Sequence, residues 1–294
     1  MTQHDSDTPE SGSAAPADPD TTHFGYRTVR AAEKAGMVRG VFDSVASRYD
    51  LMNDLMSGGV HRLWKDSFVD MVAPQAGMTC LDVGGGTGDI AFRLLDRMTR
   101  RAEASRRRMG RADPDVDASD EALAPAPPAG GGRVMVCDIN ENMIRVGRDR
   151  ALDRGLVAGL DWMVGDAEKL PVDDASVDLY TIAFCLRNVT RIDAALAEAR
   201  RVLKPGGRFF CLEFSKVVVP GLDRLYDTYS FSVLPTLGQV VARDRESYEY
   251  LAESIRRFPP QEELCRRMSA AGLRRVRYRN LSAGIAAIHS GWRL

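Results

Sequence analysis

Residues 84–88 read Gly-Gly-Gly-Thr-Gly, which contains the pattern Gly84-x-Gly86-x-Gly88, immediately after an apolar, strand-like run over residues 78–83. Glycines at the end of a strand let the backbone approach a nucleotide-like ligand in the crevice where parallel strands end. Asp89 stands where a dinucleotide-binding fingerprint has its third glycine. A carboxylate at that place disfavours a pyrophosphate and favours a ligand that carries positive charge.

Acids end the next two strand-like runs as well. Asp138 follows Gly88 by 50 residues, and by 21 once the 29-residue segment 104–132 is left out. A carboxylate that binds ribose hydroxyls is expected about 20 residues after such a loop. Asp166 follows the third run, where its carboxylate can accept from an adenine amino group while the neighbouring backbone amide meets a ring nitrogen. Glycines and acids together predict a site for S-adenosylmethionine, which carries an ammonium and a sulfonium.

The elements that would position these residues alternate along the chain. Strand-like runs lie at 78–83, 133–137, 160–164, 177–183 and 208–214, and helical patterns at 90–100, 141–154 and 191–203. This alternation predicts a parallel sheet with helices on both faces. A helix near 261–271 and two β-like runs, 274–280 and 285–291, complete the pattern. We therefore expect an α/β, Rossmann-like three-layer sandwich with a seven-stranded, mostly parallel sheet, its last strand antiparallel.

Two segments, one at the start of the chain and one in its middle, differ in composition from the rest. Residues 1–22 hold no aromatic or β-branched apolar residue, which predicts a disordered tail. The remaining residues, 23–294, form one predicted domain, and the helical pattern over 23–77 predicts a lid. Segment 104–132 combines an arginine cluster, an acidic patch and the run APAPPAGGG, which predicts a solvated, low-complexity insertion.

Charge and motif content exclude several classes of protein. Forty Lys and Arg against 41 Asp and Glu give a net charge of −1, so nothing favours nucleic acid as a partner. No apolar run approaches the roughly 18–20 residues of a membrane-spanning helix. The polar start of the chain lacks the pattern of a signal peptide, and the five cysteines form no C-x-x-C pair, which predicts reduced thiols in the cytoplasm. No metal-binding motif is present, so we expect no metal.

Three longer segments narrow the prediction. They are FDSVASRYDLMNDLMSGGVHRLWK before the glycine loop, AFCLRNV after the fourth strand-like run, and SAGIAAIHSGWRL at the end. The glycine loop resembles that of class I S-adenosylmethionine-dependent methyltransferases. The three segments resemble the ubiquinone/menaquinone biosynthesis C-methyltransferase family, over residues 22–294 apart from the insertion.

The resemblance implies a reaction and a set of cofactor contacts. The acceptor would be a ring carbon of a polyprenylated quinol, either 2-methoxy-6-polyprenyl-1,4-benzoquinol or demethylmenaquinol. Besides the loop glycines, the family's cofactor contacts correspond to Thr87, Asp138, Asp166 and Ala167 here. The family's serine before the LRN motif is Ala183 in this chain, so one expected hydroxyl contact is absent.

Methyl transfer to a quinol carbon requires proton handling beside the ring. Arg187 follows the fourth strand-like run and could stabilise a phenolate, while Asn188 could orient a hydroxyl or a water. Tyr49 in the lid could bond the ring oxygen. We rank these three first as catalytic residues and keep Asp50 and His61 as alternative bases.

The prenyl tail needs an apolar path. Apolar side chains recur at helical spacing after Pro220, and the stripe consists of Leu222, Leu225, Tyr226, Tyr229, Val233 and Leu237. Such a stripe could cover the tail and dock on a bilayer, which predicts peripheral association with the inner membrane surface or with a quinone-biosynthesis complex.

Alternatives remain open at the level of the sequence. A small-molecule or O-methyltransferase would share the cofactor loop but lack the SRYDLMN and LRN segments. A non-catalytic partner in a biosynthetic complex would not need the acids, and RNA methylation is disfavoured by the neutral charge. The choice between benzoquinol and naphthoquinol, the tail length and the oligomeric state, a homodimer included, stay open.

Overall fold

Seven strands form one sheet in a computed structural model, which describes residues 20–45, 54, 57–109, 132–219 and 245–294. Their order across the sheet is β5-β4-β3-β6-β7-β9-β8. The bounds are β3 Thr79–Val83, β4 Arg133–Asp138, β5 Leu160–Val164, β6 Val177–Ala183, β7 Leu203–Phe214, β8 Arg274–Leu281 and β9 Ala286–Trp292. The strands from β5 to β7 pair in parallel, and β9 is antiparallel to both β7 and β8. The predicted seven-stranded sheet with an antiparallel last strand is confirmed.

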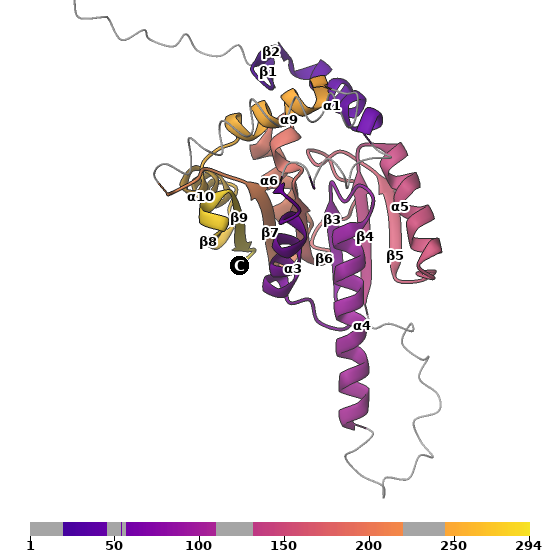
Figure 1. The fold of residues 1–294 in the computed structure, drawn as a ribbon. Helices are drawn as coiled ribbons and strands as arrows, with labels where there is room; N and C mark the ends of the chain where they lie inside the picture. The colour runs from indigo at the N-terminus through magenta and orange to yellow at the C-terminus, as the bar shows by residue number, and fades with distance from the viewer. Residues whose placement is uncertain (1–19, 46–53, 55–56, 110–131, 220–244) are drawn as a thin grey trace, which may run out of the picture.

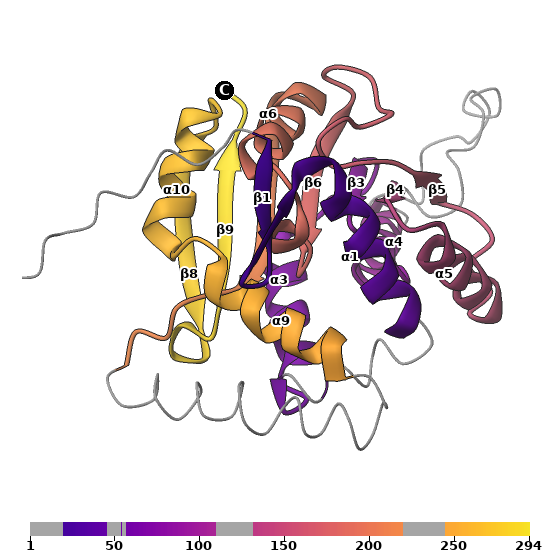
Figure 2. The ribbon, with the colours of Figure 1, turned by 90° about the horizontal axis from the view of Figure 1, so that it is seen from above.

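Helices cover both faces of this sheet, as Figures 1 and 2 show. Apolar residues of α3 and α4 pack on one face, and those of α6 and α10 pack on the other. The bounds are α1 Ala31–Val45, α3 His61–Val72, α4 Asp89–Met109, α5 Glu141–Asp153, α6 Ile192–Val202, α9 Arg245–Arg257 and α10 Gln261–Ala270. The central strands are buried on both faces because helices shield them from each side, which explains their nearly continuous apolar sequence.

The N-terminal segment differs from the prediction. A two-stranded antiparallel sheet, β1 Thr21–Phe24 and β2 Arg27–Arg30, precedes α1. Its turn contains Gly25 at φ +58°, a conformation that favours glycine. The predicted tail therefore ends too late, and the helical prediction is wrong for residues 23–30. The sequence pattern did not indicate strands here, because β1 and β2 have four residues each, too few to show the alternation of polar and apolar side chains. Residues 1–19 lie outside the described part.

The predicted insertion begins too early. Helix α4 continues to Met109, and residues 104–108 lie on its exposed surface. Low hydrophobicity favoured a loop there, yet alanine and arginine are strong helix formers and an exposed helix needs no apolar face. The last turn also carries Arg106, Arg107 and Arg108. Positive charge there is attracted to the negative end of the helix dipole and stabilises the helix. The rest of the insertion, 110–131, falls outside the described residues.

Candidate active site

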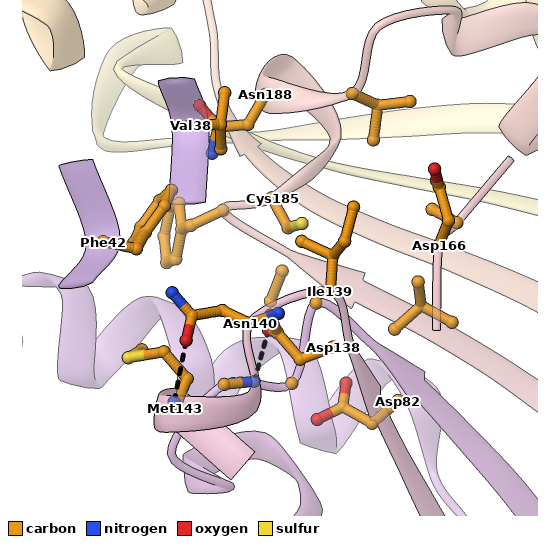
Figure 3. Close-up of a pocket in the computed structure, with 18 of the residues that line it drawn as sticks. Val38, Phe42, Asp82, Asp138, Ile139, Asn140, Met143, Asp166, Cys185 and Asn188 are labelled. Carbon is orange, nitrogen blue, oxygen red and sulfur yellow. Dashed lines mark hydrogen bonds between the residues drawn. The ribbon is translucent and has the colours of Figure 1, made fainter. Parts of the chain in front are cut away.

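A pocket opens at the carboxyl ends of β3, β4, β5 and β6, between the glycine loop and α1. Figure 3 shows Phe42 and Val38 of α1 on one side of it, Asp166 on the opposite side, and Asp138 and Asp82 at its floor. Strand ends meet here because parallel neighbours stop at the same edge of the sheet, and the topology places β3 directly between β4 and β6. The pocket therefore lies where the sequence predicted a ligand.

The glycine loop is bound to the second strand of the predicted site. Gly84 donates its N–H to Cys137 O at 2.8 Å, and Gly86 donates to Asp138 Oδ2 at 2.9 Å. Both glycines have positive φ, +62° and +51°, which L side chains rarely adopt. These bonds place the loop and the carboxylate of Asp138 in one fixed arrangement.

Asp138 ends β4 and is held by backbone donors. Besides the Gly86 bond, its Oδ1 accepts from Asn140 N at 2.8 Å. Burial raises the pKa of Asp138 to about 6, although the backbone N–H groups counteract it. Each carboxylate oxygen keeps acceptor capacity after these bonds, so the group can still receive two hydroxyls.

The remaining predicted cofactor residues line the same pocket. Asp166 follows β5, and its Oδ1 accepts from Glu168 N at 2.9 Å, while Ala167 beside it is buried. Thr87 is also buried, and its hydroxyl accepts from Arg150 Nη1 at 3.0 Å. The structure thus brings together all six residues predicted for the cofactor.

Asp82 is a pocket residue that the sequence reasoning missed. It is the next-to-last residue of β3 and is buried, and Thr181 Oγ1 donates to its Oδ1 at 2.8 Å. Its Oδ2 has no hydrogen-bond partner among the described residues. Burial raises the pKa of Asp82 to about 7. A carboxylate inside an otherwise apolar strand, two residues before the glycines, was the signal that could have revealed it.

Asp89 lines the pocket, as its position predicted, but its carboxylate is paired within the chain. Lys65 Nζ lies 2.8 Å from one of its carboxylate oxygens and Arg93 Nε lies 3.0 Å from the other. Burial works against ionisation of Asp89, but the two cations outweigh it and lower its pKa to about 2. Its charge is therefore already compensated within the chain, and Asp82 is the acid with an unpartnered oxygen.

Arg187 also differs from its predicted placement. It lies in the 3₁₀ turn η2, Leu186–Asn188, but its side chain is 1% exposed, and its Nη1 pairs with both carboxylate oxygens of Glu213, at 3.1 and 3.0 Å. Its guanidinium also donates to Phe184 O at 2.6 Å. Arg187 is absent from the pocket wall, whereas its neighbour Asn188 is part of it. The sequence could not reveal Glu213, which β7 brings to Arg187 from 26 residues away.

Three further catalytic candidates are Tyr49, Asp50 and His61. Tyr49 and Asp50 fall outside the described residues, as does the apolar stripe after Pro220. His61 is buried, and its Nε2 lies 2.9 Å from Asp54 Oδ1, away from the pocket wall.

Within the ranges described, no cluster of three His, Cys, Asp or Glu could hold a metal, and no helix is long and apolar enough to cross a membrane.

Comparison with known proteins decides the family. The sequence profile of the ubiE/COQ5 methyltransferase family matches residues 28–293. The chain belongs to this family. It is 54% identical to the ubiquinone/menaquinone biosynthesis C-methyltransferase UbiE of Paracoccus denitrificans, over 95% of this chain and 99% of that one. It is also 54% identical to the mitochondrial 2-methoxy-6-polyprenyl-1,4-benzoquinol methylase of Rattus norvegicus, over 93% and 84% of the two chains.

Solved structures support the fold. A methyltransferase of Thermotoga maritima described as S-adenosylmethionine-dependent has a TM-score of 0.56 at 18% identity, with 87% of this chain and 99% of that chain covered. One from Aquifex aeolicus has a TM-score of 0.50 at 16% identity, with 78% and 89% covered. The predicted class I methyltransferase fold and the resemblance to the quinone-biosynthesis family are both confirmed.

Proposed function

We propose that this methyltransferase transfers a methyl group from S-adenosylmethionine to a ring carbon of a polyprenylated quinol, 2-methoxy-6-polyprenyl-1,4-benzoquinol or demethylmenaquinol. The sulfonium–methyl bond breaks to leave S-adenosylhomocysteine, and the ring carbon that gains the methyl group loses its proton. The observation that carries the proposal is the 54% identity to UbiE of Paracoccus denitrificans over nearly the whole of both chains. The pocket supports it, because the glycine loop and the acids Asp82, Asp138 and Asp166 surround the space in which the cofactor would bind.

The residues of the pocket fit the cofactor. The loop at Gly84, Gly86 and Thr87 leaves room for close approach, and Asp138 would bind the ribose hydroxyls. The carboxylate of Asp166 and the amide of Ala167 would hold the adenine. The unpartnered oxygen of Asp82 would receive the ammonium, since a buried acceptor without a partner is otherwise costly. Bound in this way, S-adenosylmethionine supplies an electrophilic methyl group.

The acceptor ring would lie beside Asn188 and the apolar side chains above the loop. Val38, Phe42 and Phe184 line that part of the pocket and would exclude water from the ring. Asn188 would hold a ring oxygen, and Tyr49 stays a predicted partner of the same oxygen. Arg187 would not contact the ring. Its backbone N–H and its guanidinium both bind Glu213 and so hold in place the turn that carries Asn188.

The lipid nature of the acceptor bears on location and partners. A polyprenyl tail resides in the bilayer, so the enzyme would act from the cytoplasmic side as a peripheral protein at the inner membrane surface. Association with a quinone-biosynthesis complex and a homodimeric state are compatible with that location. We propose no nucleic acid partner and no metal.

Methyl transfer to short-chain quinols tests the function. The purified enzyme is incubated under reducing conditions with S-adenosylmethionine and either demethylmenaquinol or the methoxybenzoquinol, and the products are analysed by mass spectrometry. We expect a product with one methyl group on a ring carbon. A methyl group on oxygen would contradict the proposal, as would cofactor binding without turnover of either quinol.

The affinity for S-adenosylmethionine should rise with pH through the range set by Asp82. The ligand's ammonium prefers the ionised carboxylate, and the pKa of Asp82 is raised to about 7 by burial. Below that pKa, affinity should therefore fall by up to about tenfold for each pH unit. Calorimetry between pH 5 and about 7 measures this, because an α-amino group is still largely protonated over that range.

The variant Asp82→Asn is the matched control for this pH dependence. It keeps the shape and the bond from Thr181 but removes the titrating group. We expect weaker binding and a flatter profile near pH 7, with a residual slope near pH 6 from Asp138, whose pKa burial raises to about 6. An unchanged profile in this variant would show that Asp82 does not face the ammonium.

A further inference from the structure

Only one of the two polar atoms in the side chain of Asn188 has a hydrogen-bond partner among the described residues. Asn188 is 6% exposed, its Oδ1 accepts from the hydroxyl of Tyr250 at 3.0 Å, and its Nδ2 has no hydrogen-bond partner among the described residues. Figure 3 shows this amide at the upper end of the pocket, with the nitrogen on the side of Phe42. A buried donor without a partner calls for an explanation, and a ligand in the pocket provides one.

The backbone around Asn188 is fixed independently of its side chain. Asn188 N donates to Cys185 O at 2.9 Å, which closes the turn η2. Next to it, Arg187 N donates to Glu213 at 3.2 Å, and the Arg187 guanidinium pairs with the same carboxylate. These bonds leave the side chain of Asn188 free to rotate, and the torsion of its terminal amide is broad and roughly two-fold when nothing restrains it.

Tyr250 supplies that restraint from a different part of the chain. It belongs to α9, is 4% exposed, and stacks on Phe24 of β1 with ring centroids 4.1 Å apart and an angle of 19°. The same hairpin is bound to α9 a second time, through Tyr26 N and Glu253 Oε2 at 2.9 Å. Figures 1 and 2 both show β1 and β2 lying against α9. The hydroxyl of Tyr250 is therefore held in place at the amide.

Tyr250 remains a donor over the physiological range. Burial raises the pKa of its hydroxyl above the ordinary value, so the proton stays on the oxygen. A hydroxyl that donates to the amide oxygen of Asn188 leaves the NH₂ group to face the other way.

We propose that Tyr250 is a positioning residue that orients the amide of Asn188, so that its Nδ2 donates to an oxygen of the acceptor ring. The inference rests on the proposed function, because it takes the acceptor to be an oxygen-bearing ring. The bond selects which ring carbon faces the cofactor. The N-terminal hairpin thus contributes to the site through Phe24 and Tyr250 without touching the acceptor.

The variant Tyr250→Phe tests this directly. It removes only the hydroxyl, and the ring that stacks on Phe24 is retained. We expect kcat/KM for a short-chain quinol to fall about tenfold, the scale of one hydrogen bond, with the Kd of S-adenosylhomocysteine unchanged. Asn188→Ala should lose about 10²-fold, as for a donor that contacts the reacting group. Thermal unfolding of each variant establishes that it is folded.

A double variant separates positioning from a general structural effect. If Tyr250 acts through Asn188, the change Tyr250→Phe should have no further effect in the Asn188→Ala enzyme. The matched control is Tyr278→Phe. Tyr278 lies on the edge strand β8, and its hydroxyl is hydrogen-bonded to Glu262 of α10, so removal of this hydroxyl should leave turnover unchanged.

The outcomes distinguish this inference from the function on which it rests. Normal quinol turnover by Tyr250→Phe would overturn the inference alone, and so would losses that add in the double variant. Failure of the wild-type enzyme to methylate any quinol would overturn the proposed function and this inference with it. A tenfold loss that disappears in the Asn188→Ala background would support both.

Discussion

Replacing Arg187 by methionine is expected to destabilise the fold by about 3–5 kcal/mol, the cost of breaking a buried ion pair. Arg187 and Glu213 are each 1% exposed in their side chains, so the remaining carboxylate would be left without water or a counter-charge. Native proteins are stable by only about 5–15 kcal/mol, so this loss is a large fraction of the total. It should lower the Tm by roughly 10 °C, which calorimetry or circular dichroism measures.

Two controls identify the unpaired carboxylate as the cause. The double variant Arg187→Met, Glu213→Leu removes both charges and should recover most of the loss, since apolar replacement of a whole buried pair is often neutral. In the single variant, the deficit should shrink as pH falls. Burial already raises the pKa of Glu213 in the wild type, and a further rise without Arg187 favours the proton in the folded state. A single variant of wild-type stability with poor quinol turnover would instead restore Arg187 as a residue of the reaction.

The contrast between Arg187 and the glycine loop shows what the sequence could predict. Strand ends, the loop and Asp138 follow from local patterns, because the direction of a parallel strand fixes which of its ends faces the crevice. The partner of Arg187 does not follow from such patterns. Glu213 lies on β7, and only the register of β6 against β7 brings the two side chains together.

The dependence on contacts between distant elements also explains why the sequence favoured Asp89 and missed Asp82. Both are acids beside the glycine loop, and the sequence favoured Asp89 because of its place in the motif. Lys65 comes from α3, whose position over α4 depends on tertiary packing, and it pairs with Asp89. Asp82 has no cation in contact and keeps one free acceptor among the described residues. Which of two acids remains available to a cationic ligand is therefore decided by contacts between distant elements.

In the glycine loop, the variant Gly84→Ala should be destabilised by about 1–3 kcal/mol more than the matched variant Gly58→Ala. Both glycines have nearly the same backbone conformation, at φ +62° and +58°, so each alanine carries the same strain of about 1–2 kcal/mol. At Gly58 a new Cβ would meet no described atom within 4 Å. At Gly84 it would lie 2.1 Å from Cys185 Sγ and 2.4 Å from Cys185 Cβ.

The clash at Gly84 cannot be relieved by rotating one side chain, because the Cβ of Cys185 moves only with its backbone. Either the glycine loop or the turn that carries Asn188 must therefore shift, and both line the pocket. We expect Gly84→Ala to weaken S-adenosylmethionine binding by about tenfold or more, equivalent to about 1.4 kcal/mol, and Gly58→Ala to leave it unchanged. Denaturant unfolding and calorimetry of the two variants measure the two effects. Equal stability and equal affinity would mean that Cys185 yields freely and that the contact between the loop and η2 does not shape the site.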